Sequence, residues 1–135
     1  MLITAICGLP IIANELPRSS SPDGAQVYFI EPNDGDVING TKIEVVFGLS
    51  GMGVAPAGIE VMNTGHHHLL IDVDNIDLQM PIPSDANHLH FGGGQTEAVI
   101  ELEPGKHTLQ LILADHLHIP HNPPVVSEVI TITVE

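Results

Sequence analysis

The fold is indicated most clearly by the stretch Lys106-His107-Thr108-Leu109-Gln110-Leu111-Ile112-Leu113-Ala114. Successive side chains of a β-strand point to opposite faces. His107 and the leucines at 109, 111 and 113 therefore share one face, and Thr108, Gln110 and Ile112 share the other. Glu103-Pro104-Gly105 supplies a turn just before this stretch. The pattern predicts a well-defined strand with one strongly apolar face.

Short apolar stretches of the same kind recur along the chain, separated by many of its 13 glycines and 11 prolines. No stretch has convincing helical periodicity. Residues 32–41 and 104–111 also resemble segments of bacterial immunoglobulin-like domains. We therefore predict an all-β protein, an immunoglobulin-like antiparallel β-sandwich. Besides 106–114, the predicted strands are Val27–Ile30, Thr41–Leu49, His66–Val73, Thr96–Leu102 and Val125–Val134, whereas residues 80–95 are expected to be a loop.

The chain of 135 residues is long enough for one domain with a real core. Residues 26–135 are the expected sandwich domain and 14–25 a polar linker. Residues 1–13 resemble the apolar region and cleavage site of a secretory signal, cut after Ala13, but lack the basic leader, so we interpret them as a truncated signal peptide. This run is too short to span a bilayer, which takes about 20 residues. We expect an exported protein with no membrane insertion in its mature form.

The charge of the chain is strongly negative. Three basic residues stand against 17 acidic ones, which gives a formal net charge of -14 with histidine neutral. No basic patch is available to neutralise phosphates, so nucleic acid is excluded as a partner. Cations, in contrast, are attracted by such a field. Cys7 is the only cysteine and lies in the apolar N-terminal run, so the predicted domain has neither a disulfide nor a thiolate metal site.

All nine histidines of the chain fall between His66 and His121. Eight form three groups, Gly65-His-His-His68, Asn87-His-Leu-His90 and Asp115-His-Leu-His-Ile-Pro-His121. On extended backbone each His-X-His pair presents two imidazoles to one side, which predicts metal ligands. Leu89, Phe91, Leu117 and Ile119 would then point inward. The candidate ligands are His66, His68, His88, His90, His116, His118 and His121.

The second face of the first group looks buried, since His67 shares it with Leu69 and Ile71. His67 is therefore predicted to be a structural, hydrogen-bonded residue. Asn87 and Asp115 are predicted to accept the second N–H group of a ligand and so fix its tautomer. The isolated His107 is expected to be hydrogen-bonded rather than a ligand.

The donor types narrow the identity of the metal. An imidazole-rich site suits copper, zinc or nickel; copper is favoured by intrinsic affinity, and zinc is the alternative. A blue-copper centre is excluded because the predicted domain lacks cysteine. Other interpretations stay open: a polar hydrogen-bonded network, a site for an organic ligand, or pH sensing, since nine protonations would change the charge from -14 to -5.

Several runs are specific enough to indicate a family. They are Phe47 to Gly58, Thr64-Gly-His-His-His-Leu-Leu-Ile-Asp72, Asn87-His-Leu-His-Phe-Gly-Gly-Gly-Gln-Thr96, Gly105 to Leu111 and Asp115-His-Leu-His-Ile-Pro-His-Asn-Pro-Pro-Val-Val-Ser127. These runs resemble a bacterial domain of unknown function that occurs in small exported proteins. The resemblance covers about Val27 to Val134. It implies a periplasmic or secreted location and no mechanism.

Three functions fit these observations. The first is a periplasmic or secreted copper-binding protein, acting in metal storage, delivery or protection, with the metal ion as its partner. The second is a copper enzyme like the copper–zinc superoxide dismutases, which also place His-X-His pairs on an immunoglobulin-like sandwich. The third is a non-catalytic immunoglobulin-like binding or structural module. The sequence contains no Ser–His–Asp order, paired catalytic carboxylates or phosphate loop, so a non-enzymatic role is favoured over an enzyme.

Overall fold

The computed structural model describes residues 15–135, and over these residues the protein consists of strands and loops without a helix. The predicted signal peptide and Cys7 lie outside this part of the chain. The strands are β1 (Gln26–Glu31), β2 (Val37–Ile38), β3 (Lys42–Ser50), β4 (Gly53–Val54), β5 (Thr64–Ile71), β6 (His88–His90), β7 (Glu97–Glu101), β8 (Gly105–Ala114) and β9 (Ile130–Val134).

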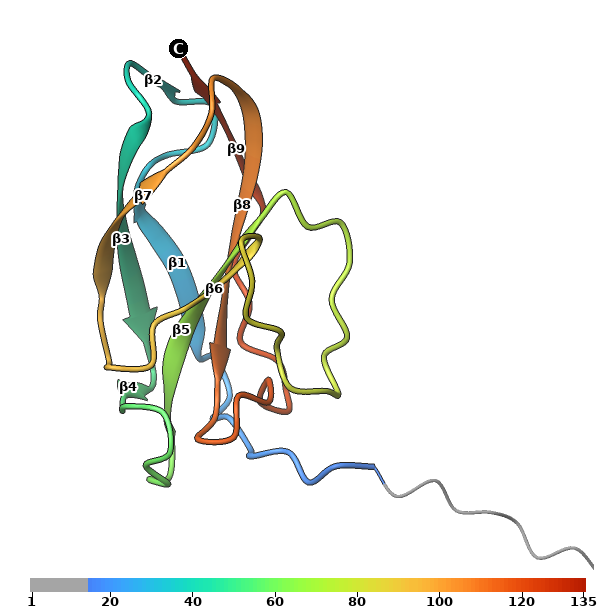
Figure 1. Cartoon of the computed structure of the whole chain (residues 1–135). Helices are drawn as coiled ribbons and strands as arrows, with labels where there is room; N and C mark the ends of the chain where they lie inside the picture. The colour runs from blue at the N-terminus through green and yellow to red at the C-terminus, as the bar shows by residue number, and fades with distance from the viewer. Residues whose placement is uncertain (1–14) are drawn as a thin grey trace, which may run out of the picture.

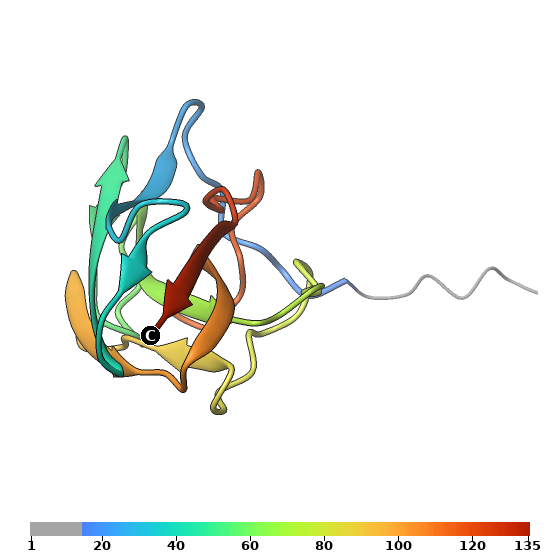
Figure 2. The ribbon, with the colours of Figure 1, turned by 90° about the horizontal axis from the view of Figure 1, so that it is seen from above.

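The strands form two sheets that pack face to face (Figures 1 and 2). The smaller sheet has the order β1-β3-β7. The larger has the order β2-β9-β8-β5-β4, with β6 also paired to β5. All pairings are antiparallel except two short ones, β2 with β9 and β4 with β5. The prediction of an all-β antiparallel sandwich is confirmed.

The core between the sheets is aliphatic, as the scarcity of aromatic residues requires. Val45 and Phe47 of the smaller sheet face Leu69, Leu111 and other buried residues of the larger one, which form a single apolar cluster. Alternate residues of β8 are buried in this cluster, as the period of two in 106–114 predicts. Burial of this apolar surface is the main force that holds the two sheets together.

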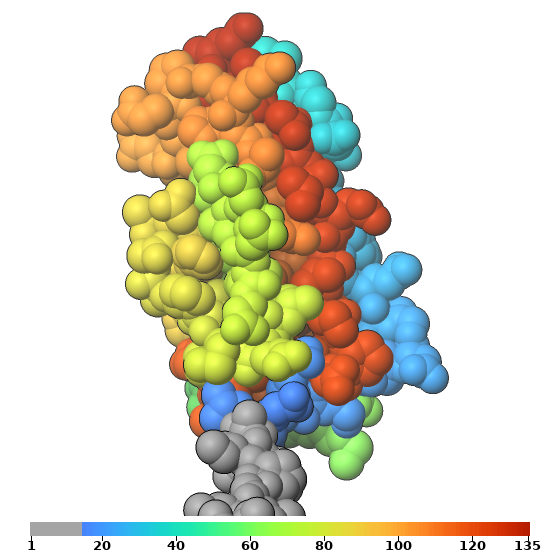
Figure 3. Space-filling view, turned by 90° about the vertical axis from the view of Figure 1, so that its right-hand side faces the viewer, coloured from blue at the N-terminus to red at the C-terminus, as the bar shows by residue number. Residues whose placement is uncertain are grey.

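A second, smaller apolar cluster lies on the outer face of the larger sheet. Leu70, Ile112 and Ala114 are buried there beneath Ile82. Ile82 belongs to the long connection between β5 and β6, which lies over this face in Figure 3, in lime and yellow. The outer side of β5 is therefore partly shielded from water, which matters for the histidines that point to it.

Two predicted element boundaries were wrong. Residues 88–90, expected in a loop, form β6, because their backbone pairs with the central strand β5. The closing strand spans only Ile130–Val134 instead of starting at Val125. Residues 125–127 still bind β8 through single hydrogen bonds, with Leu113 N donating to Val125 O and Ser127 N to Leu111 O. Between these residues and β9 the backbone ladder is interrupted, because Leu111 N donates to the Ser127 side-chain oxygen instead of to a backbone carbonyl.

Residues 18–21, within the predicted linker, lie against the loop that follows β8. The Arg18 side chain donates hydrogen bonds to the carbonyl oxygens of Pro120 and His121. Ser20 forms an isolated parallel bridge with Asn122. Along residues 15–135, no helix has the length and apolar character needed to cross a membrane.

Candidate metal centre

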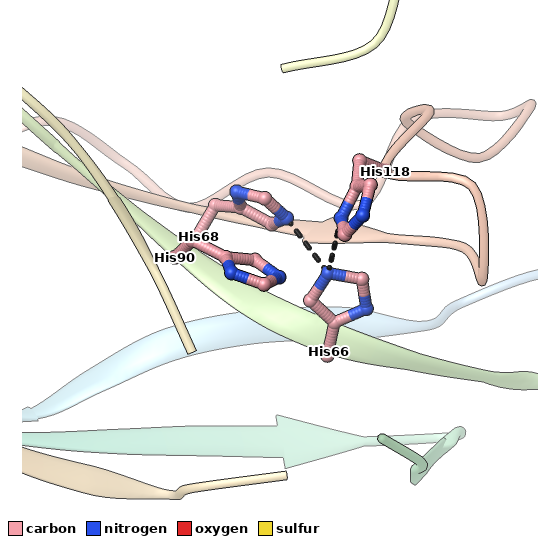
Figure 4. Close-up of side chains that lie close together, drawn as sticks. All are labelled: His66, His68, His90 and His118. Carbon is pink, nitrogen blue, oxygen red and sulfur yellow. Dashed lines mark hydrogen bonds between the residues drawn. The ribbon is translucent and has the colours of Figure 1, made fainter. Parts of the chain in front are cut away.

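Four histidine rings converge at one place on the outer side of the larger sheet (Figure 4). The Nε2 atoms of His66 and His68 are 2.9 Å apart, and Nε2 of His66 is 3.1 Å from Nδ1 of His118. Taking one ring nitrogen from each of His66, His68, His90 and His118, all four atoms lie within 4.8 Å of one another. No carboxylate belongs to this group, which makes it an all-imidazole donor set.

Strand β5 supplies two of these rings through its alternation. His66 and His68 point to the outer face, whereas His67 between them points into the sandwich. The small Ala114 lies opposite His66 on β8 and leaves space for imidazoles above the sheet. Both rings are fully shielded, with 0% of His66 and 1% of His68 exposed. The strand thus presents two rigidly placed donors from within the fold.

His90 approaches from the neighbouring strand β6. It lies directly opposite His68 in the antiparallel register, so the two side chains stand on the same face. The centre of its ring is 5.0 Å from those of His66 and His68 and 4.7 Å from that of His118. Unlike the pair on β5, His90 is exposed, so the group opens to solvent on this side.

His118 comes from a turn after β8 and has a left-handed backbone conformation, with φ of 65°. Asp115 builds this turn, since its Oδ1 accepts hydrogen bonds from the backbone N–H groups of Leu117 and Ile119. Its Oδ2 accepts one from the Ser19 hydroxyl. Asp115 therefore fixes the backbone that presents His118 to the other rings.

The prediction of extended backbone around His116 and His118 was wrong, because this segment is a turn. The two side chains do not share a face. Nε2 of His116 lies 3.7 Å from a carboxylate oxygen of the exposed Glu60. Leu117, predicted to point inward, is 51% exposed, while Ile119 is buried as predicted.

Burial and mutual proximity keep the β5 imidazoles neutral. Burial, aided by the neighbouring rings, lowers the pKa of His66 to about 4 and that of His68 to about 2. The pKa of His90 is also lowered, first by partial burial and then by His118. A neutral imidazole has the free lone pair that a metal ion needs. His66 and His68 are therefore in the ligating charge state near pH 7 without any deprotonation.

The polar partners predicted for these rings lie elsewhere. The Asn87 amide nitrogen donates to the carbonyl oxygen of Ile71, and Asp115 is engaged in its turn. The Nδ1 atoms of His66 and His68 are buried without a hydrogen-bond partner. The Nε2 atoms of His66 and His68 lie next to each other, and in a contact between two neutral imidazoles only one nitrogen can donate a hydrogen bond to the other. Hydrogen bonding within the protein thus leaves this cluster poorly satisfied.

His67 is buried as predicted, but the predicted hydrogen bond was wrong. Both of its ring nitrogens lack a partner, and the ring packs against Phe47 with 5.0 Å between the ring centres. Burial lowers its pKa to about 4. His67 is therefore neutral in the core near pH 7 and takes no part in the group on the other face.

The remaining predicted ligands lie outside the group, each with its own contact. Nδ1 of His88 donates to Asp85 Oδ1 at 2.8 Å. Nε2 of His121 donates to the Thr64 carbonyl oxygen at 3.0 Å. His107 binds Asp72 and the Glu103 carbonyl oxygen, which confirms its predicted structural role. Of seven candidate ligands, the structure brings together His66, His68, His90 and His118, and it leaves apart His88, His116 and His121.

The fold and the site define a small β-sandwich protein with a surface-facing cluster of four imidazoles compatible with metal binding. The chain belongs to the family described as domain of unknown function DUF4399, whose model matches residues 45–135. This match confirms the resemblance seen in the sequence and includes every histidine of the group. No curated protein and no solved structure matches the chain.

Proposed function

We propose that this protein binds one transition-metal ion through His66, His68, His90 and His118, and that the favoured metal is copper. The observation that carries the proposal is the convergence of four ring nitrogens from three separate segments within 4.8 Å. Structural histidines usually satisfy their nitrogens with carbonyl or carboxylate oxygens, as His107 and His121 do here. In this group the nitrogens instead face one another, which favours a site shaped around a cation.

The spacing of the nitrogens supports this proposal. In a tetrahedral site with metal–nitrogen distances of about 2.0–2.1 Å, neighbouring ligand atoms lie about 3.3 Å apart. The separations of 2.9 and 3.1 Å around His66 are close to this spacing. An ion placed among the rings would accept one nitrogen lone pair from each imidazole. The proton of each neutral ring would then be on its other nitrogen, which points away from the ion. The ion would also replace contacts in which the imidazoles satisfy one another poorly.

The donor set favours copper over the other metals. Imidazole suits Cu(II), Ni(II) and Zn(II), and the intrinsic order of affinity places copper highest. Zinc remains the alternative, because it accepts four imidazoles in the tetrahedral geometry. Hard cations such as Mg²⁺ and Ca²⁺ prefer oxygen ligands, and the group offers none. We further propose a periplasmic or secreted location, where the protein would store, deliver or sequester the ion.

Elemental analysis of untagged protein, followed by titration of the metal-free form with Cu(II), tests the proposal. We expect one ion per chain and an electron paramagnetic resonance spectrum with hyperfine structure from several nitrogen ligands. Absence of any stoichiometric metal together with no uptake of Cu(II) or Zn(II) would falsify it.

Variants separate this site from adventitious binding by other histidines. His68→Ala removes a buried donor of the group and should abolish stoichiometric binding at low micromolar Cu(II). His88→Ala and His116→Ala are matched controls, since each removes an imidazole that lies outside the group. Equal losses in all three variants would assign the copper to scattered surface histidines instead.

A further inference from the structure

We propose that Gly92 is a positioning residue for the metal site, because only a glycine there lets the His90 ring join the other three. This inference rests on the proposed function and concerns the exposed ligand of the same four-histidine site. It gives a reason for the glycine at position 92, the first of the glycine run 92–94.

The contact between Gly92 and His90 is too close for any side chain. A Cβ atom built on Gly92 would lie 2.2 Å from Cε1 and 2.6 Å from Nε2 of His90. These separations are far inside van der Waals contact, so the ring and a methyl group cannot occupy their places together. The backbone angle φ of Gly92 is not in the left-handed region, so the reason for glycine at this position is space for the ring.

The backbone around Gly92 is held in place, which leaves the ring as the part that moves. The Gly92 carbonyl oxygen accepts a hydrogen bond from Ala57 N, and Phe91 N donates to the carbonyl oxygen of His67. The Phe91 ring packs on Phe47 in the core, with 4.9 Å between ring centres. These contacts of Phe91 and Gly92 thus resist a shift of the chain.

The His90 ring, in contrast, has little to hold it. Within residues 15–135 it makes no side-chain hydrogen bond, and it is the exposed member of the group. In Figure 4 it lies beside the His66 and His68 rings. Its position is determined by the three other imidazoles on one side and the bare Gly92 backbone on the other. A methyl group on Gly92 would rotate His90 away and leave a site with three imidazoles.

The glycine run provides a matched control. A Cβ on Gly93 would lie 3.2 Å from the flexible Gln95 side chain, whose atoms, and not those of His90, are its three nearest neighbours. Gly93→Ala therefore changes the same loop by the same atom without touching the site. Gly94→Ala is unsuitable, because φ of 82° at Gly94 is strained for any other residue.

The test compares Cu(II) binding by the wild type, Gly92→Ala, His90→Ala, the double variant and Gly93→Ala, with thermal unfolding of each metal-free protein. Loss of a group that orients a ligand typically weakens metal affinity about 10- to 100-fold. We expect Gly92→Ala to lose affinity by such a factor and to give the paramagnetic resonance spectrum of His90→Ala. The double variant should be no weaker than His90→Ala, since the methyl then meets no ring. Gly93→Ala should match the wild type.

The outcomes distinguish this inference from the proposed function. If the wild type binds no metal, the proposed function fails and the role of Gly92 fails with it. If the wild type binds and Gly92→Ala binds equally well with the same spectrum, only the role of Gly92 is refuted. A further loss of affinity when Gly92→Ala is added to His90→Ala would also refute it, because the methyl would then act through the fold and not through the ring.

Discussion

His67 shows how much a single side chain on β5 can affect stability. Its ring is fully buried between the sheets with both nitrogens unpartnered, and such a polar group costs free energy relative to an apolar one. Its neighbours His66 and His68 serve the opposite face. His67 can therefore be replaced without removing a ligand, and its contribution to stability can be measured by itself.

We expect His67→Leu to raise the free energy of unfolding of the metal-free protein, most strongly in acid. The folded pKa of about 4 lies below the ordinary value of 6.5, so the unfolded state binds more protons as the pH falls through this range. The imidazole thus lowers stability progressively below pH 6.5, by about 2 kcal/mol at pH 5. Urea unfolding at pH 7.5 and pH 5 measures this. An unchanged difference between the two pH values in the variant would contradict it.

Asp115 is the residue whose loss should most disturb His118. Asp115→Ala leaves the buried N–H group of Ile119 and its neighbour at Leu117 without their acceptor and releases Ser19. We expect a loss of about 1–3 kcal/mol of stability and weaker Cu(II) binding. Asp85→Ala is the matched control, since Asp85 holds His88 outside the group. Denaturant unfolding and copper titration of both variants check this, and equal copper affinity in the two would argue against it.

At the scale of elements, the sequence was sufficient where strands are regular. The alternation of β3, β5 and β8 predicted which residues enter the core and that His66 and His68 share the outer face. The register of β5 with β6, which sets His90 opposite His68, depends on long-range pairing that no local pattern specifies. For the same reason β6 was expected to be a loop.

The third histidine group could not be interpreted by the same rule. The pattern at 115–119 matches that at 87–91, yet one segment forms a turn and the other a strand. Asp115 bonds to the backbone two and four residues further on and so stabilises the turn, a capacity that short polar side chains have in loops. Which of the two conformations wins depends on Ser19 and the packing around Ile119, and both are set by distant parts of the chain.

The segment 18–21 and the loop 115–123 behave as one element, joined by Arg18, Ser19 and Ser20. We expect a chain that begins at Pro22 to keep the sandwich but to bind Cu(II) more weakly, because the turn carrying His118 loses its support. Circular dichroism and copper titration of the truncated chain test this. Wild-type affinity in that chain would show that Asp115 suffices alone.

The whole molecule carries a formal charge of -14, which acts on any approaching ion. A field of this sign raises the local concentration of cations and speeds their encounter, and salt screens it over about 10 Å at 0.1 M. We expect the association rate of Cu(II) to fall as a non-coordinating salt is added, while the dissociation rate changes little. Stopped-flow mixing at several ionic strengths measures both rates. An association rate independent of salt would show that the negative charge of the protein does not steer the ion to its site.

The rings at positions 66 and 118 are 52 residues apart in the chain, with His90 between them. A single ion bound to all of them would tie two strands and a turn together in a domain that contains no cysteine pair. Such a tie would act in this small domain as a covalent cross-link does in others, with the difference that a chelator can remove it. An ion that binds only the folded state would then raise the resistance of the domain to heat and proteases.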